Sequence, residues 1–232
     1  MPEQPLVSII IVNYKDYSYL DQCLYSLATT TYPNIEIIVV DNNSNVALIR
    51  KLKDKYKQVE FFSLKENLNY AEGNNYGIKK SNGDFIVLLN NDTKVQNDWM
   101  EPLVREGLVN PKAFYQPIIY SLDNHDIIFS LGGTVTPLGI AFPISAEKHI
   151  SKVHLPKKRT EIFSCAGACI FTSRELLDEL GGLDSNYWTF YEDVNLGWKG
   201  RLRGYPSFIV PDSNIYHKWG GTQGRELSKK KL

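Results

Sequence analysis

The chain has 232 residues, with 26 basic and 26 acidic side chains and therefore no formal net charge. This length suits one large domain with a substantial core, and a neutral composition that is 43% hydrophobic does not call for a nucleic-acid partner. No stretch approaches the ~20 apolar residues of a membrane span, the N-terminus lacks a signal-peptide pattern, and three dispersed cysteines do not form a disulfide framework, so we expect a reduced, cytoplasmic protein.

The first half of the chain alternates apolar, β-branched runs with patterns of helical period. In order, these segments cover residues 6–12, 18–27, 35–40, 46–56, 59–63, 71–80 and 85–89. The first helical pattern has apolar residues on one face, and Ser18 is its predicted N-cap. The order βαβαβαβ implies an α/β fold, with a Rossmann-like, mainly parallel central sheet, helices on both faces and right-handed crossovers.

Polar residues rich in Asn and Asp follow three of these strands. The clusters are NYKDY at 13–17, DNNSN at 41–45 and NNDT at 90–93. Because ligands of open parallel sheets bind outside the carboxyl ends of the strands, we expect the three clusters to converge on one rim. Asn13, Tyr14 and Asn91 are therefore candidate substrate-binding residues.

Two common phosphate-binding motifs are absent. The segment after the first strand, VNYKDYSYL, has no glycine, so a dinucleotide fingerprint is missing, and the chain also lacks a P-loop. A phosphate would then have to be held through a divalent metal, and Asp92 is suited to Mg²⁺ or Mn²⁺ because these ions prefer hard oxygen ligands. The alternative is that NNDT only ends its strand in an Asx-turn.

The second half of the chain has a different pattern. Residues 127–142 contain strand-like runs broken by Gly and Pro, which favours antiparallel hairpins, and IFSCAGACIFT at 162–172 is predicted to be a strand. A helix at 174–180 should stop at Gly181. A last helix should place Val194, Trp198 and Leu202 on one face. We expect one domain over 1–232, with a nucleotide-binding half at about 1–110 and an acceptor-binding and catalytic half at about 111–232.

Five motifs in order resemble those of the GT-A-fold family 2 glycosyltransferases, in particular the rhamnosyltransferase-like bacterial branch. They are VSIIIVNYKDYSYLDQCLYSL, IEIIVVDNNSNV, NLNYAEGNNYGIKKSNGDFIVLLNNDT, GACIFTSRELLDELGGLDSNYWTFYEDVNLGWKGRLRGY and HKWGG. The resemblance implies inverting transfer of a sugar from a UDP- or dTDP-linked donor, with Mg²⁺ or Mn²⁺. It also implies a saccharide or lipid-linked acceptor in cell-surface polysaccharide biosynthesis, at the inner face of the plasma membrane.

The resemblance assigns the donor-side residues. Asp41 matches an acidic residue that contacts the base or ribose, and Asn43 follows it in the same motif. Asn69, Gly73 and Asn74 match a loop and helix start beside the diphosphate or sugar. For Asp41 the alternative is an Asx-turn that ends the second strand, and for Gly73 it is a simple bend.

The resemblance also assigns the metal ligands. NND occupies the place of the family's Asp-x-Asp, so Asp92 keeps the metal-binding carboxylate while Asn90 replaces the first acid with a neutral amide. This departure should lower metal affinity in the absence of nucleotide. His217 in IYHKWGG matches a histidine that can be a further metal or phosphate ligand, and the alternative is an ordinary loop histidine.

The motif YEDVNL matches the catalytic step of the family. Asp193 is then the base that takes the proton of the acceptor hydroxyl, with Glu192 as the rival, since adjacent helical residues point about 100° apart. Without the resemblance, Glu192 and Asp193 are simply two acids at a helix N-terminus, where the helix dipole favours negative charge. Trp188 belongs to an aromatic cluster that could stack on an acceptor sugar or simply pack in the core.

Two other classes of function stay open. A sugar-nucleotidyltransferase would need a basic, Gly-rich loop after the first strand, which NYKDY does not supply. A non-catalytic relative that binds carbohydrate or nucleotide sugar would fit Asn90 but not the retention of four candidate site residues. The basic tail GRELSKKKL has two interpretations: it is a solvated terminus, or it is weakly attracted to anionic lipid headgroups and makes a peripheral membrane contact. The oligomeric state stays open.

Overall fold

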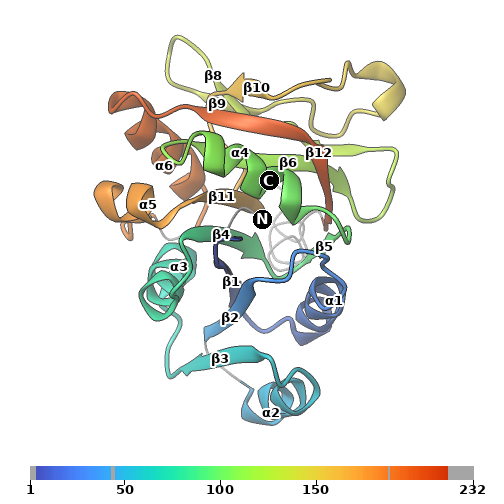
Figure 1. The fold of residues 1–232 in the computed structure, drawn as a ribbon, viewed down its shortest axis with the longest axis vertical. Coiled ribbons are helices and arrows are strands. Elements are labelled where there is room, and N and C mark those ends of the chain that lie inside the picture. Colours follow the sequence, from blue (N-terminus) through green and yellow to red (C-terminus); the bar gives the residue numbers. More distant parts are fainter. Residues whose placement is uncertain (1–3, 43–44, 188, 219–232) are drawn as a thin grey trace, which may run out of the picture.

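A computed structural model describes residues 4–42, 45–187 and 189–218 (Figure 1). Its first half follows the predicted alternation of strands and helices. In chain order the elements are β1 (Val7–Asn13), α1 (Tyr17–Leu27), β2 (Ile35–Asn42), α2 (Val46–Lys55), β3 (Val59–Leu64), α3 (Asn69–Lys80) and β4 (Phe85–Asn90). The predicted N-cap Ser18 is wrong, because the carboxylate of Asp16 accepts the hydrogen bond from Tyr19 N that caps α1. Such a cap stabilises a helix by about 1 kcal/mol.

The second half contains shorter strands and further helices. They are β5 (Thr93–Val95), α4 (Met100–Val109), β6 (Phe114–Ser121), β7 (Ile128–Ser130), β8 (Gly133–Val135), β9 (Ala141–Pro143), the 3₁₀ helix η1 (Ile150–Lys152), β10 (Thr160–Ile162), β11 (Cys169–Ser173), α5 (Arg174–Leu180), α6 (Glu192–Leu202) and β12 (Ser207–His217). The antiparallel hairpin predicted within 127–142 is confirmed as β8 and β9. The single strand predicted at 162–172 is wrong, because its centre leaves the sheet: Ala166 N donates to the Gln116 side chain instead of to a neighbouring strand.

One sheet joins the two halves. Within the described residues it has ten strands, and its main order is β10-β12-β6-β11-β4-β1-β2-β3. The strands β4, β1, β2 and β3 are parallel, β11 joins β4 in antiparallel orientation, and β12 runs parallel to β6. The prediction of a mainly parallel sheet with a smaller antiparallel region is confirmed.

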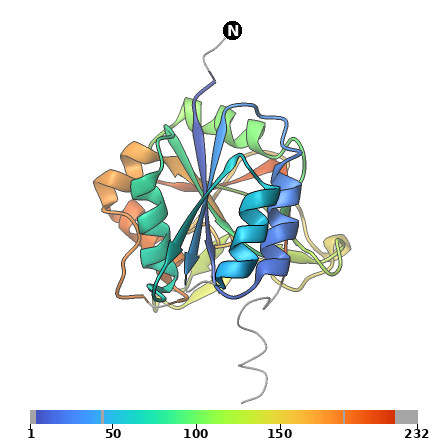
Figure 2. The same ribbon diagram turned by 90° about the horizontal axis from the view of Figure 1, so that it is seen from below.

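Helices cover both faces of the parallel strands. Figure 2 shows α3 on one face and α1 and α2 on the other. Side chains alternate accordingly along β1: Ile9 and Ile11 pack in the core that contains α1 and α4, whereas Ile10 and Val12 pack in the core that contains α3 and α5. This burial on both faces explains why the strands appear in the sequence as continuous apolar runs. Among the described residues, no helix combines the length and hydropathy that crossing a bilayer requires.

The last helix, α6, packs through a face that the sequence did not indicate. Trp198 is 40% exposed and Leu202 is 76% exposed, so the predicted apolar face with Val194 is not the buried one. The helix instead approaches the sheet through Gly197 and Gly200, where an added Cβ would lie 2.5 and 2.6 Å from neighbouring side chains. The predicted sharing of one face by Val194, Trp198 and Leu202 is confirmed by the bounds of α6. The sequence did not indicate the packed face, because small residues allow close packing without contributing to an apolar pattern.

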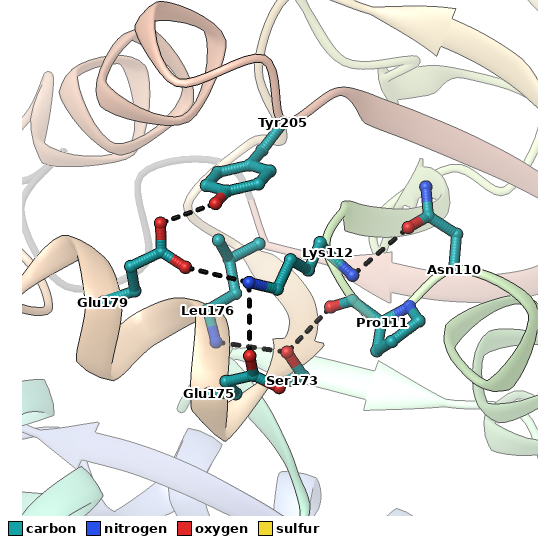
Figure 3. Close-up of polar contacts among 8 residues, drawn as sticks. All are labelled: Asn110, Pro111, Lys112, Ser173, Glu175, Leu176, Glu179 and Tyr205. Atoms are coloured by element: carbon teal, nitrogen blue, oxygen red, sulfur yellow. Dashed lines mark hydrogen bonds and ion pairs between the residues drawn. The ribbon is translucent and has the colours of Figure 1, made fainter.

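Polar contacts tie α5 to the segment before β6 (Figure 3). The ammonium of Lys112 lies 3.2 Å from carboxylate oxygens of both Glu175 and Glu179, and Tyr205 donates to Glu179. Ser173 donates to Pro111 O at 2.7 Å and caps α5. The ion pairs are exposed and contribute little. The buried Ser173 contact is the stronger constraint on how α5 meets the sheet.

Candidate functional site

The ends of β1, β2 and β4 lie at one level. Asn13 pairs with Asp41 across β1 and β2, and Val12 pairs with Asn90 across β1 and β4. Asn13 Nδ2 donates to Asp41 Oδ1 at 2.8 Å, and Asn91 Nδ2 donates to Asn13 Oδ1 at 2.7 Å. The predicted convergence of the three polar clusters on one rim is therefore confirmed.

Asp41 is buried at this rim, and its two oxygens differ in their contacts. Oδ1 accepts the hydrogen bond from Asn13, whereas Oδ2 lies 3.4 Å from the hydroxyl of Tyr17, a long and weak contact. The Tyr17 hydroxyl also accepts a hydrogen bond from Asn45 N. Oδ2 is therefore the less engaged of the two Asp41 oxygens.

Asp92 and His217 form a buried pair beside this rim. Strand β5 pairs with β12, and the register His217–Thr93 brings the imidazole next to the residue before Thr93. His217 Nε2 lies 2.9 Å from Asp92 Oδ1, and both side chains are less than a tenth exposed. His217 Nδ1 is buried and has no hydrogen-bond partner in the described part of the chain.

The pair fits a divalent metal only with help from a ligand. Within the described ranges, no group of three or more His, Cys, Asp or Glu side chains has an arrangement that could hold an ion. An ion bound between Asp92 and His217 would have one carboxylate and one imidazole from the protein. Mg²⁺ and Mn²⁺ sites often complete such a shell with substrate phosphates and water. The residues present are thus compatible with an ion that arrives together with a diphosphate.

The predicted residues of α3 have mainly internal contacts. Asn69, with φ of 69°, accepts a hydrogen bond from Glu72 N through its side chain, and its carbonyl accepts one from Asn42. Gly73 lies within α3, where an added Cβ would meet Val12 Cγ1 at 3.0 Å, so it permits close packing of α3 on β1. Asn74 is fully buried, and its Oδ1 has no hydrogen-bond partner in the described ranges.

Asp193 and Glu192 begin α6 and point to different surroundings. Asp193 Oδ2 accepts from Gly167 N and Oδ1 accepts from Val194 N, both at 2.7 Å. Burial raises the pKa of Asp193, and these main-chain donors oppose that rise. Burial also raises the pKa of Glu192 to about 7, with a further contribution from the charge of Asp193. Glu192 Oε2 is buried without a partner in the part of the chain that the structure describes.

A pocket of about 460 Å³ adjoins Asp193. Its lining includes Phe142 from β9 and Phe190 and Tyr191 from the segment before α6, but not Glu192. Phe190 and Tyr191 have φ of 67° and 69°, a left-handed conformation that is uncommon for bulky residues and costs of order 1–3 kcal/mol each. The segment thus holds two exposed aromatic rings beside a carboxylate despite this strain.

The remaining predicted residues lie at the edge of the site or beyond it. Tyr14 directly follows β1 and is partly exposed, with the Lys15 ammonium 4.7 Å from its ring centre. Asn43 and Trp188 lie outside the described residues, as does the basic tail.

Sequence reasoning missed three residues of the site, Tyr17, Tyr70 and Phe142. Tyr70 OH lies 2.8 Å from Asn90 Oδ1 and 2.9 Å from Gly167 O. Tyr17 lies within NYKDY and Tyr70 within NLNYAEG, but their aromatic character alone did not mark them as polar contacts. Phe142 had no signal in the sequence, because only the hairpin fold brings it to the pocket.

Comparison with known proteins gives a consistent result. Residues 8–181 match the protein family described as glycosyl transferase family 2. The chain is similar to O-antigen biosynthesis protein RfbC of Myxococcus xanthus, with 28% identity over 92% of this chain and 17% of that protein. It is also similar to the N-acetylglucosaminyl-diphospho-decaprenol L-rhamnosyltransferase of Mycobacterium tuberculosis, with 22% identity over 95% of this chain and 78% of that protein.

Solved structures show the same architecture. The crystal structure of GalNAc-T7 with UDP, GalNAc and Mn²⁺ superimposes with a TM-score of 0.80 and 21% identity, over 97% of this chain and 46% of that chain. At this identity the likeness establishes a GT-A fold and nothing finer. The chain spans less than half the length of several curated relatives that it matches.

Proposed function

The chain belongs to glycosyl transferase family 2, and we propose that it is a metal-dependent, inverting glycosyltransferase that uses a UDP- or dTDP-sugar. The proposal includes a hexose or deoxyhexose as the transferred sugar and a saccharide or lipid-linked acceptor in cell-surface polysaccharide biosynthesis. GalNAc-T7 was crystallised with UDP and Mn²⁺, and a mannosyltransferase of Pyrobaculum calidifontis with GDP-Man and Mn²⁺. These neighbours support a nucleotide donor and a divalent ion without specifying either.

The rim at the ends of β1 and β2 suits the nucleoside of the donor. Asp41 Oδ2 is only weakly engaged by Tyr17, so it can accept a ribose hydroxyl or a ring N–H. Asn13 fixes the other oxygen and thereby sets the orientation of the carboxylate. Tyr14 and the predicted Asn43 complete the proposed nucleoside contacts.

The Asp92–His217 pair suits the diphosphate end of the donor. These two side chains would hold Mn²⁺ or Mg²⁺, and the imidazole favours Mn²⁺. When bound, the ion would stabilise the negative charge that develops on the leaving diphosphate. Asn90 contributes no charge here, so the protein alone should bind the ion weakly.

Asp193 is the proposed base, in preference to Glu192, because Asp193 lines the pocket and Glu192 does not. Each Asp193 oxygen accepts one main-chain amide at 2.7 Å and keeps a second lone-pair direction for the acceptor hydroxyl. Burial raises the pKa of this carboxyl, which makes the carboxylate a stronger base than an exposed aspartate. Asp193 would take the hydroxyl proton as that oxygen attacks the anomeric carbon opposite the leaving diphosphate.

The pocket beside Asp193 is the proposed acceptor site. Phe142, Phe190 and Tyr191 give it an aromatic rim, which can stack on the apolar face of a sugar ring while a hydroxyl reaches the carboxylate. The volume of about 460 Å³ lies within the range of small-molecule sites. In this scheme the strained backbone at 190–191 serves to present the two rings.

The surroundings of this pocket support a lipid-linked acceptor and peripheral attachment at the inner face of the plasma membrane. The hairpin β8–β9, at the opposite end of the molecule from β3 in Figure 1, carries Leu138, 87% exposed, and Ile140, 52% exposed. The following segment carries exposed lysines that form no ion pair with any described residue. These are Lys148, Lys152, Lys157 and Lys158. Exposed apolar residues, together with unpaired cations in the segment that follows them, favour contact with an anionic lipid surface.

The observation that carries the proposal is the placement of two acidic centres at the same end of the sheet. Asp92 lies 2.9 Å from His217, which contacts Asn90 at the end of β4. Asp193 accepts a hydrogen bond from Gly167 N, and Tyr70 contacts both Asn90 and Gly167. One centre suits the leaving diphosphate and the other suits the attacking hydroxyl, which is what transfer with inversion requires.

The experiment is a screen of UDP- and dTDP-sugars for donor hydrolysis with Mn²⁺ or Mg²⁺, followed by transfer to saccharide acceptors. Proton NMR of the transfer product would give the anomeric configuration of the transferred sugar. We expect this configuration to be inverted relative to the donor. Calorimetry with UDP and dTDP, with and without Mn²⁺, tests binding separately. Metal-dependent nucleotide binding without any turnover would instead indicate a non-catalytic relative.

A further inference from the structure

A series of buried polar contacts connects the two acidic centres. Asp92 Oδ1 lies 2.9 Å from His217 Nε2, which lies 3.1 Å from the amide of Asn90. The other end of the Asn90 amide lies 2.8 Å from the hydroxyl of Tyr70. That hydroxyl lies 2.9 Å from Gly167 O, and Gly167 N donates to Asp193 at 2.7 Å.

Hydrogen-bond chemistry constrains how this series is arranged. In the protein without a bound ion, His217 Nε2 is close to Asp92, an acceptor, and to one end of the Asn90 amide. An Nε2–H that donates to Asp92 then requires that end of the amide to be the carbonyl oxygen. The two ends of an amide are assigned from such contacts. The Asn90 NH₂ group then faces Tyr70 and donates to its oxygen, and Tyr70 donates its single proton to Gly167 O. In this arrangement each contact joins a donor to an acceptor.

The arrangement also accounts for the amide at position 90. An asparagine has both a donor and an acceptor, so it can join the imidazole of His217 to the hydroxyl of Tyr70. An ionised aspartate has only acceptors and would require both neighbours to donate. Tyr70 would then have no proton left for Gly167. Asn90 therefore provides an internal connection between His217 and Tyr70.

The position of Gly167 constrains the position of the Asp193 carboxylate. An added Cβ on Gly167 would lie 3.3 Å from Asp193 Oδ2, so the loop and the carboxylate are in direct contact. The residues on either side of Gly167 have their own contacts: Asn90 N donates to Ala168 O, and Ala166 N donates to the Gln116 side chain. Gly167 itself is held by Tyr70 at its carbonyl and by Asp193 at its N–H.

We propose that Tyr70 is a positioning residue whose hydroxyl fixes Gly167, and through it the Asp193 carboxylate, relative to the Asp92–His217 pair. The inference rests on the proposed function insofar as Asp193 acts as the base. In physical terms, one side chain of α3, that of Tyr70, connects the donor end of the site with the acceptor end. Occupation of the donor end should therefore restrict the loop at 163–168.

The test uses Tyr70→Phe, which removes only the hydroxyl, with Tyr76→Phe on the same helix as the matched control. Hydrogen exchange of the peptide that contains Gly167 is measured by mass spectrometry in both variants and in the unchanged protein. Exchange at Gly167 should rise at least ~10-fold in Tyr70→Phe, the consequence of losing about 1.4 kcal/mol of local stability, and should not change in Tyr76→Phe. Equal exchange in all three proteins would overturn the proposal, whether or not the protein is an enzyme.

A second arm addresses the coupling. UDP or dTDP with Mn²⁺ should slow exchange at Gly167 in the unchanged protein and have less effect in Tyr70→Phe, while nucleotide affinity measured by calorimetry stays within about twofold. Donor hydrolysis should fall at least ~10-fold in Tyr70→Phe but should not fall further when Tyr70→Phe is added to Asp193→Asn. If the double variant lost hydrolysis by the product of the two single-variant losses, Tyr70 would not act through Asp193. Absence of nucleotide binding and hydrolysis in the unchanged protein would instead reject the proposed function, and the exchange comparison would still decide the role of Tyr70.

Discussion

Glu192 should make the folded protein less stable as the pH rises. The residue is only 6% exposed, and its Oε2 has no hydrogen-bond partner in the described ranges. Burial, followed by the charge of Asp193, raises its pKa from 4.5 to about 7. An acid whose pKa is raised on folding binds more protons in the folded state, so its stability contribution is complete below pH 4.5 and is lost as the pH rises through 7.

The magnitude follows from the pKa difference. At ~1.36 kcal/mol per pKa unit, ionised Glu192 destabilises the folded state by about 3 kcal/mol at pH 8 relative to pH 4. Partial access of water would reduce this value, so ~1.5–3 kcal/mol is expected. Glu192→Gln keeps the shape and removes the charge. The variant should therefore be more stable than the unchanged protein at pH 8 and similar to it at pH 4.

Urea unfolding at pH 4, 5, 6, 7 and 8 measures this difference directly. Glu60→Gln, an exposed position on β3, is the matched control and should leave the pH dependence unchanged. If Glu192→Gln has the same pH dependence as the unchanged protein, or is less stable at pH 8, then Glu192 is not a buried, unpaired carboxylate and the reasoning fails.

Three further predictions concern the site and its surface. Asp193→Asn should lower donor turnover by ~10²–10⁴ in steady-state assays while calorimetric nucleotide affinity is retained, and a loss of both would argue against a role confined to the chemical step. Asp92→Ala should abolish the gain in UDP or dTDP affinity that Mn²⁺ produces, and an unchanged gain would show that the ion binds elsewhere. In co-sedimentation with phosphatidylcholine–phosphatidylglycerol vesicles, Leu138→Ser should weaken binding several-fold, whereas Leu202→Ser, also exposed, should not; equal binding of both variants would remove the β8–β9 hairpin from the proposed membrane contact.

Much of the first half could be predicted because its signals are local. Apolar runs at β1, β2 and β4 are buried on both faces of the sheet, and each ends in Asn and Asp at the level where ligands bind. The positions of Asn13, Asp41 and Asn91 relative to one another then follow from parallel register alone. The position of Asp92 was also predictable, since it lies in the turn directly after β4, whose end reaches the same rim.

The second half depended on contacts that are distant in sequence. His217 meets Asp92 only because β12 pairs with β5 more than a hundred residues earlier in the chain. Phe142 reaches the pocket only through a separate hairpin, and α6 packs through small residues that leave no apolar pattern. None of these relationships has a local period that sequence reasoning can detect.

The sequence alone determined the order of strands and helices, the rim at which polar side chains gather and, through resemblance to a family, the class of chemistry to expect. The tertiary structure decided which of the adjacent acids faces the pocket, and that Asn90, Tyr70 and Gly167 connect the two acidic centres. The physical reason is that strand formation and burial depend on neighbouring residues, whereas a hydrogen bond between α3 and the loop at 163–168 depends on how the whole sheet brings them together.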